Sequence, residues 1–220
     1  MRVSVITPAF NAASTLRRMH GSLVAQTMRD WEQIIVNDGS TDATAAIVRE
    51  IANEDSRVRV LTTPNRGPGA ALNAGIAQNR NEFVAFLDAD DEYYPDHLAK
   101  HLAFFDQLPA VDILWGGVDV ITANPEDAHV PDVVKGFGYI HISECVVQGT
   151  LFVRRKVFER FAFSEDRAVW YQDCDFVQRA GQVFSVARFH DVTYRYYRNS
   201  GASLVDRMKE NWQVAQTGGS

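Results

Sequence analysis

Four short apolar runs, each followed by a helical pattern, dominate the first half of the chain. The runs are rich in β-branched residues and lie at residues 3–6, 33–36, 58–61 and 83–87. Between them, apolar residues recur at three- and four-residue spacing, which is typical of helices. Strands and helices that alternate in this way form a mainly parallel sheet flanked by helices. The sequence therefore predicts an α/β fold.

The pattern changes after residue 111. Residues 111–122 predict one more strand, and residues 123–138, rich in Pro, Gly, Asp and Asn, predict a long loop of the kind that often binds ligands. Because 220 residues are somewhat few for two independent cores, we expect one domain. The remaining expected elements are strands at 147–153, 183–189 and 192–197, helices near 155–161 and 173–181, and a short helix in the tail beyond residue 206.

Charge and composition exclude several classes of protein. A net charge of −6 argues against a nucleic-acid-binding protein, which needs a concentrated Lys/Arg surface. The clusters at 17–18 and 154–156 suit solvated helix faces better than a membrane patch. Two cysteines, Cys145 and Cys174, form no disulfide framework, and no apolar run has the roughly 20 residues of a membrane span. We expect a cytoplasmic protein with free thiols, and we leave open a peripheral contact with the inner face of the membrane.

Acidic residues crowd the end of the fourth predicted strand, in the stretch FVAFLDADDEYYPDHL. Residues two apart in an extended segment project to the same side, so Asp88 and Asp90 are expected to share one crevice at the sheet edge where α/β folds bind ligands. Carboxylate oxygens suit Mn²⁺ or Mg²⁺, whose shell is completed by water and a phosphorylated ligand. The alternative is that the acidic residues favour the following helix N-terminus. We accept it for Glu92 and leave it open for Asp91, but it does not explain Asp88.

Five motifs carry a family resemblance, in order over residues 1–177: VSVITPAFNA, WEQIIVNDGSTDAT, PNRGPGAALNAGI, the Asp-x-Asp stretch above and VWYQDCDF. Together they make the chain similar to the inverting glycosyltransferases of family 2. The resemblance implies a GT-A fold, a single Rossmann-like domain over residues 1–204 with a mixed, mainly parallel sheet. It further implies a nucleotide-binding half at about 1–110, an acceptor-binding half at about 111–204, and a C-terminal tail at 205–220.

The same resemblance assigns the donor site. Asp38 would face the base edge, and a carboxylate there accepts hydrogen bonds from uracil or guanine, of which we favour uracil. Leu72 stands where relatives often have Arg, which leaves Arg66 as the nearest cation for the donor phosphates. The metal, Mn²⁺ or Mg²⁺, would be bound by Asp90 and Asp91. The nucleotide-binding residues implied are Thr7, Pro8, Ala9, Phe10, Asp38, Arg66, Asn73, Asp88 and Ala89.

The last motif contains the implied general base, Asp173. Without the resemblance, a helix cap would be the simpler explanation of this residue. Partial desolvation near Trp170 and Tyr171 would raise its pKa and improve it as a base. The chain departs from the family pattern in having Gln172 in place of Glu and in lacking a His near residue 199. Trp115, Trp170 and Tyr171 could stack against the acceptor sugar, although aromatic residues beside strands more often belong to the core.

Two functions from different classes follow from these residues. The first is transfer of a sugar from a nucleotide-diphosphate sugar, preferably a UDP-sugar, to a hydroxyl of a glycan or lipid-linked acceptor, with inversion at the anomeric carbon. The second is a non-catalytic module that binds nucleotide sugars or glycans and retains the fold. Nucleotidyl transfer is weaker, because the N-terminus lacks a glycine-rich, basic triphosphate loop.

Overall fold

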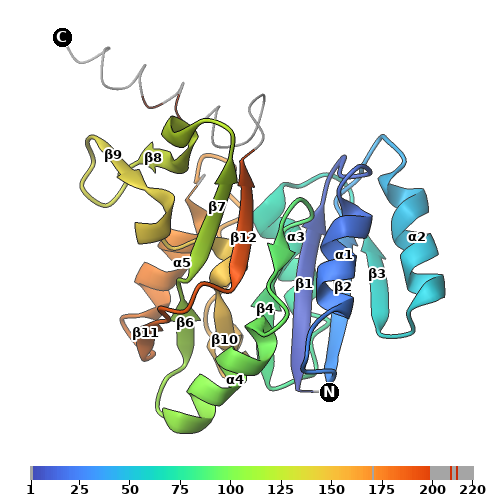
Figure 1. The fold of residues 1–220 in the computed structure, drawn as a ribbon, viewed down its shortest axis with the longest axis horizontal. Coiled ribbons are helices and arrows are strands. Elements are labelled where there is room, and N and C mark those ends of the chain that lie inside the picture. The colour runs from blue at the N-terminus through green and yellow to red at the C-terminus, as the bar shows by residue number, and fades with distance from the viewer. Residues whose placement is uncertain (1, 170, 199–208, 210–211, 213–220) are drawn as a thin grey trace.

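A seven-stranded sheet runs through the molecule (Figure 1). The computed structural model describes residues 2–169, 171–198, 209 and 212. All neighbouring strands of this sheet are parallel except β10, which is antiparallel to both β4 and β6. The predicted mixed, mainly parallel sheet is therefore confirmed. In spatial order the strands are β11 (Val186–Arg188), β6 (Ile113–Trp115), β10 (Phe152–Arg154), β4 (Phe83–Phe86), β1 (Val3–Ala9), β2 (Trp31–Asn37) and β3 (Val58–Thr62).

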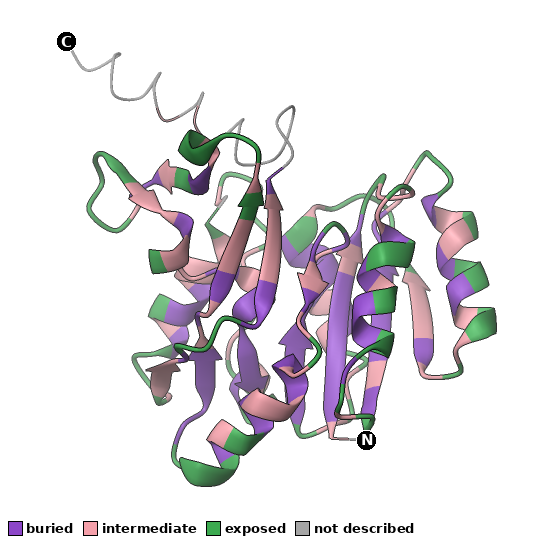
Figure 2. Ribbon diagram, in the orientation of Figure 1, coloured by how far each residue is buried: buried purple, intermediate pink, exposed green. Residues whose placement is uncertain are grey.

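Helices cover both faces of the sheet. Successive strand residues point to opposite faces, so Val3 and Val5 share one apolar cluster while Ile6 belongs to the other. The first cluster includes the apolar faces of α1 (Leu16–Val24), α2 (Thr44–Glu54) and α4 (His97–Gln107). The second includes those of α3 (Pro68–Ile76) and α5 (Gln172–Ala180). The central strands are accordingly buried along their length (Figure 2).

The prediction of one strand over 111–122 is wrong. Gly116 and Gly117 have φ values of +112° and +77°, and they break the segment into β6 and β7 (Val118–Thr122). A Cβ atom at Gly117 would lie 1.9 Å from the carbonyl oxygen of Asp191, so this corner requires glycine. The corner sends β7 into a second sheet, whose order is β5 (Glu92–Tyr93), β12 (Tyr194–Arg198) and β7.

Several predicted boundaries in the second half also need correction. The predicted loop 123–138 contains a short 3₁₀ helix, η1 (Pro125–Ala128), and strand β8 (His129–Pro131), which pairs with β9 (Tyr139–His141). The predicted strand 147–153 begins as the 3₁₀ turn η3 (Gln148–Thr150) before β10, and the predicted helix 155–161 is the 3₁₀ helix η4 (Arg155–Glu159). A further 3₁₀ turn is η2 (Ile142–Glu144). The predicted tail helix falls largely outside the described residues.

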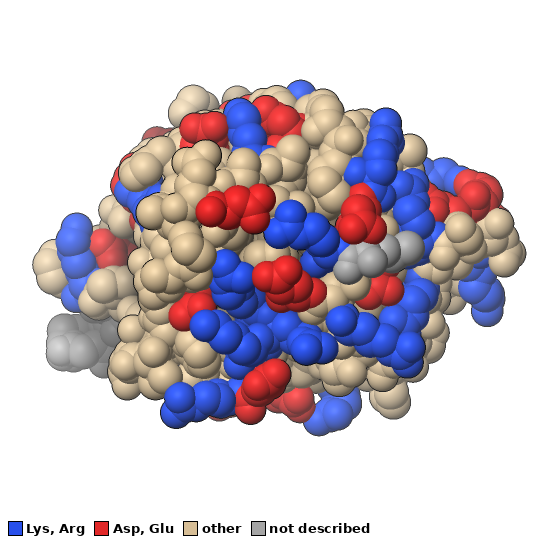
Figure 3. Space-filling model, turned by 90° about the horizontal axis from the view of Figure 1, so that it is seen from below, with Lys and Arg blue, Asp and Glu red and all other residues tan. Residues whose placement is uncertain are grey.

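The basic clusters of the sequence are matched by carboxylates. Arg17 contacts Glu50 and Glu54, and Lys156 contacts Asp112. Figure 3 shows the same mixture on the face seen from below, where Lys and Arg lie among Asp and Glu. Within the part of the chain that the structure describes, no helix combines the length and the apolar character needed to cross a membrane.

Candidate active site

A cavity of about 1490 Å³ opens where the carboxyl ends of β1, β2 and β4 meet. Ligands of open α/β sheets bind at this edge. The facing wall comes from residues 130–148 and from the start of α5. The site residues predicted from the sequence that line this cavity are Pro8, Ala9, Phe10, Asp38, Asp88, Ala89, Asp90, Asp91, Trp115, Tyr171 and Asp173.

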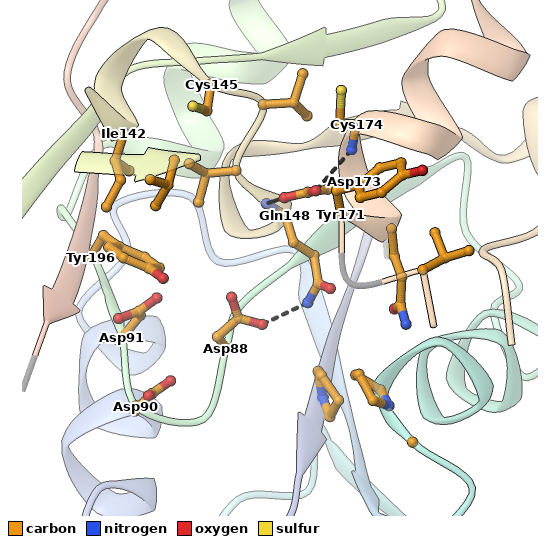
Figure 4. A pocket seen from close by; sticks show the side chains of 18 of the residues that line it. Asp88, Asp90, Asp91, Ile142, Cys145, Gln148, Tyr171, Asp173, Cys174 and Tyr196 are labelled. Atoms are coloured by element: carbon orange, nitrogen blue, oxygen red, sulfur yellow. Dashed lines mark hydrogen bonds between the residues drawn. The ribbon is translucent and has the colours of Figure 1, made fainter. Parts of the chain in front are cut away.

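Asp88 lies at the centre of the acidic end of this cavity, just beyond β4 (Figure 4). Its Oδ1 atom accepts a hydrogen bond of 2.6 Å from Nε2 of Gln148. Desolvation, together with the smaller effect of the charges of Asp90 and Asp173, raises the pKa of Asp88 to about 7. A carboxyl group in this position would be held in its charged form by a bound cation.

Asp91 and Asp90 lie beside Asp88 but differ in their surroundings. Asp91 is buried, and its carboxylate accepts hydrogen bonds from the Tyr194 hydroxyl (2.6 Å) and the Tyr197 peptide N–H (2.7 Å). Burial and the neighbouring Asp90 and Asp88 raise its pKa well above the usual range. The Asp90 side chain also lines the cavity; it is exposed overall, and partial desolvation within the cavity raises its pKa. Asp91 is thus anchored to β12, whereas Asp90 remains accessible from the cavity.

Asp173 lies across the cavity from this cluster, in the first turn of α5 (Figure 4). Its two carboxylate oxygens accept hydrogen bonds from the peptide N–H groups of Cys174 (2.8 Å) and Gln148 (3.0 Å). Burial nevertheless raises the pKa of Asp173 to about 6, the direction that the sequence predicted. A carboxylate with this pKa is charged at neutral pH and is more basic than an exposed one.

Sequence reasoning missed Gln148 and Tyr194. Gln148 contacts Asp88 through its side chain and Asp173 through its backbone. The hydroxyl of Tyr194 donates to Asp91 from a position 103 residues away. The only local signal was a polar Gln-Gly pair inside the apolar run VVQGTLF, which suited a strand poorly.

Asp38 organises the loop that precedes α3. Its carboxylate accepts hydrogen bonds from the peptide N–H groups of Arg66 (3.1 Å) and Gly67 (2.8 Å) and from the Thr63 hydroxyl (3.0 Å). Gly67 has a φ of +96°, which favours glycine at this bend. These bonds fix the loop at the cavity edge, and the contact of Asp38 with a base stays a prediction.

Three predicted nucleotide-binding side chains are not brought to the cavity. The buried Thr7 hydroxyl accepts a hydrogen bond from Gln33. The Arg66 guanidinium contacts Glu165 at 2.6 Å, and the Asn73 amide bonds to the backbone of Phe163. Arg66 and Asn73 thereby fasten the segment before α5 to α3.

The predicted acceptor aromatics give a mixed result. Trp115 lines the cavity with Arg188 over its ring at 5.1 Å, and Tyr171 lines it with an exposed fraction of 36%. Trp170 lies outside the described residues.

Three carboxylates of the cavity, those of Asp88, Asp90 and Asp91, form its acidic end. Among its described lining residues, seven carry acidic side chains and three, Lys135, Arg167 and Arg198, carry basic ones. The opposite side, around Asp173, is mixed: Cys145 and Cys174 lie on it in Figure 4, and Asp132 and Glu144 are close enough to Cys145 to raise its pKa. Burial raises the pKa of Cys145 to about 12 and that of Cys174 to about 11, so both free thiols are neutral.

Comparison with solved structures defines the class of fold. The chain is similar to TarS 1–349 of S. aureus in complex with UDP-GlcNAc, with a TM-score of 0.74, 23% identity and coverage of 93% of this chain and 60% of that one. It is also similar to the mannosyltransferase PcManGT from Pyrobaculum calidifontis in complex with GDP-Man and Mn²⁺, with a TM-score of 0.71, 20% identity and coverage of 98% and 60%. The predicted GT-A fold is confirmed.

Comparison of sequences identifies the family. The model of Glycosyl transferase family 2 matches residues 4–162, and the chain belongs to this family. An uncharacterized glycosyltransferase of Escherichia coli K12, YibD, is 44% identical over 94 residues, which cover 43% of this chain and 27% of the relative. Another, alr2836 of Nostoc sp. PCC 7120, is 36% identical over 125 residues, which cover 56% and 38%. These matches therefore span less than half of either relative.

Proposed function

We propose that the protein transfers a sugar, with inversion, from a nucleotide-diphosphate sugar to a hydroxyl group of a glycan or lipid-linked acceptor. The observation that carries this proposal is one cavity with three carboxylates at its acidic end and a separate, partly buried carboxylate, Asp173, on its facing wall. The two ends then serve the departing diphosphate and the attacking hydroxyl. A module that only binds its ligand has no need for the raised pKa of Asp173.

The donor is a UDP-sugar bound along the carboxyl ends of β1, β2 and β4. The half-exposed ring of Phe10 offers a surface for the base, and backbone groups of residues 7–10 contact the ribose. Asp38 already accepts three hydrogen bonds, but its carboxylate keeps lone pairs that suit uracil N3–H. Asp88 and Ala89 complete the nucleotide contacts.

A divalent cation, Mn²⁺ or Mg²⁺, fits the acidic end. Asp90 and Asp91 offer hard oxygen ligands beside Asp88, and such ions usually take one or two carboxylates and complete their shell with water and substrate phosphate. Within the described residues, no three His, Cys, Asp or Glu side chains form a metal cluster of their own. When bound, the ion supplies positive charge to the departing diphosphate. The preponderance of acidic lining residues makes this charge necessary for a diphosphate ligand.

Asp173 acts as the general base. It takes the proton of the acceptor hydroxyl while that oxygen attacks the anomeric carbon and the bond to the diphosphate oxygen breaks. No covalent enzyme intermediate is needed, because attack and departure occur on opposite sides of the sugar. Apolar and aromatic residues that line the same cavity, among them Val177, Trp115 and Tyr171, favour an acceptor that carries an apolar part next to its reactive hydroxyl.

The test is release of UDP from a panel of UDP-sugars with Mn²⁺, without acceptor and with methyl or octyl glycosides. The proposal expects release that depends on one donor and increases with acceptor, more strongly with the octyl series. Binding of UDP-sugars without release under any of these conditions would favour the non-catalytic module. GDP-sugars in the same assay test the preference for uracil.

A further inference from the structure

Gln148 contacts both carboxylates on which the proposed reaction depends. Its side-chain Nε2 donates to Oδ1 of Asp88 at 2.6 Å, and its peptide N–H donates to Oδ2 of Asp173 at 3.0 Å (Figure 4). Asp88 follows β4 and Asp173 begins α5, so the two belong to separate elements. A single residue therefore bridges the two ends of the cavity.

The backbone around Gln148 is firmly held. The Thr150 hydroxyl donates to the carbonyl of Val147 at 2.7 Å and accepts from the peptide N–H of Gly116 at 3.0 Å. Gly149 packs so closely under Tyr194 that a Cβ atom there would lie 2.0 Å from the ring. Because Tyr194 also donates to Asp91, the turn η3 is connected to three carboxylates of the cavity.

Like charges on the partly buried Asp88 and Asp173 need such a connection. Two carboxylates facing one cavity repel each other, and the repulsion is strongest where water is excluded. One residue that donates to each of them through a different N–H group opposes this repulsion and defines their separation. Atoms about to react must lie roughly 3–3.5 Å apart, and a misplacement of about 1 Å can cost a factor of about 100 in rate.

We propose that Gln148 is a positioning residue that sets the separation between Asp88 at the donor end and Asp173 at the base end. This inference rests on the proposed function. With the nucleotide held at Asp88, Gln148 presents the sugar at the correct distance from the acceptor oxygen held by Asp173. Because the peptide N–H survives any side-chain substitution, Gln148 variants lose the contact with Asp88 and keep the contact with Asp173.

The first experiment compares Gln148→Met with a matched control. Methionine has nearly the same length as glutamine but no N–H donor, and Gln107→Met makes the same change at an exposed position at the end of α4. In Gln148→Met we expect kcat to fall about 10- to 100-fold. The stoichiometry of UDP binding by calorimetry should not change, and the donor KM should rise less than about threefold. A merely structural role would instead lower the fraction of protein that binds UDP. A kcat within twofold of the control would overturn the proposal.

A double-mutant cycle with Asp88→Ala then tests the contact itself. If Gln148 acts through Asp88, adding Gln148→Met to Asp88→Ala has no further effect on the midpoint of urea unfolding. Additive effects would mean that Gln148 acts elsewhere, and would overturn the proposal. The unfolding measurement does not require enzymatic activity. It can therefore refute the positioning role of Gln148 on its own, whereas the proposed function fails if the wild-type protein releases no UDP from any donor.

Discussion

Replacing Asp173 with Asn is expected to make the folded protein more stable at pH 8 while it removes sugar transfer. Asp173 is a partly buried carboxylate whose charged form is disfavoured by desolvation, so folding at pH 8 includes the free-energy cost of keeping it ionised. Asparagine has almost the same shape and carries no charge. The loss of the base should lower kcat by about 10²–10⁴.

The size of the stabilisation follows from the raised pKa. A change from 3.8 to about 6 is about two pKa units, or about 3 kcal/mol of unfolding free energy at pH 8. Asparagine offers one acceptor oxygen where Asp173 accepts from both Cys174 and Gln148, and the lost hydrogen bond costs about 1 kcal/mol. The net gain is about 2 kcal/mol, equivalent to about 4–8 °C in Tm for a chain of this size.

The dependence on pH distinguishes this explanation from a general effect on packing. A raised pKa in the folded state gives stability that is present at low pH and is lost as pH rises through the folded-state pKa. The Asp173→Asn variant should therefore be no more stable than the wild type at pH 4, and its stability relative to the wild type should rise between about pH 4 and pH 6.

Urea unfolding at pH 4 and pH 8 measures this difference. Asp175→Asn, on the same helix, is the control, since it removes the pair with Arg179 and should not stabilise the protein at pH 8. The reasoning is refuted if Asp173→Asn lowers stability by the same amount at both pH values.

Three further predictions concern the base, the metal and the packing of the site. With Asp173 as base, kcat should fall tenfold per pH unit below about pH 6 and level off above it, which a pH–rate profile over pH 4.5–8.5 will show; a flat profile would contradict this role. Asp90→Ala should weaken UDP binding in the presence of Mn²⁺ by at least about tenfold, so that its affinity equals that of the wild-type protein in EDTA. Calorimetry measures both affinities, and the metal assignment is refuted if EDTA leaves the binding of UDP by the wild-type protein unchanged. Gly149→Ala should lower the free energy of unfolding by about 1–3 kcal/mol, because its Cβ would meet the Tyr194 ring at 2.0 Å. Its control in urea unfolding is Gly21→Ala, whose Cβ meets nothing within 4 Å in the middle of α1, and equal stability of the two variants would contradict the packing.

The sequence predicted the elements whose pattern is local. The strands and helices up to α4, except the short β5, follow from periodicity. Asp88 and Asp90 line one cavity, although Asp90 lies in a turn after β4 and not in the extended segment that the prediction assumed. The contacts that complete the site are not local. Gln148 bonds to Asp88 across 60 residues, and Arg66 pairs with Glu165 across 99. An arginine side chain can line the cavity or pair with a neighbouring carboxylate. The outcome depends on how distant parts of the chain pack together, and no single motif contains that information.

The interpretation of Asp91 illustrates the same limit. From the sequence, this residue was either a metal ligand or a charge that favours the next helix. The structure adds a third role, since its carboxylate accepts hydrogen bonds from two residues of β12. The signal for this role lies more than one hundred residues further along the chain.

The antiparallel course of β10 between β4 and β6 also has a consequence for biosynthesis. Until β10 leaves the ribosome, β4 exposes unpaired peptide groups along one side, and such a strand is a template for aggregation. At roughly 5–20 residues per second, the interval between the two strands lasts several seconds. A fragment ending near residue 110 would retain this exposed side permanently, so shortening the chain to its predicted nucleotide-binding half is a poor route to a soluble minimal binder.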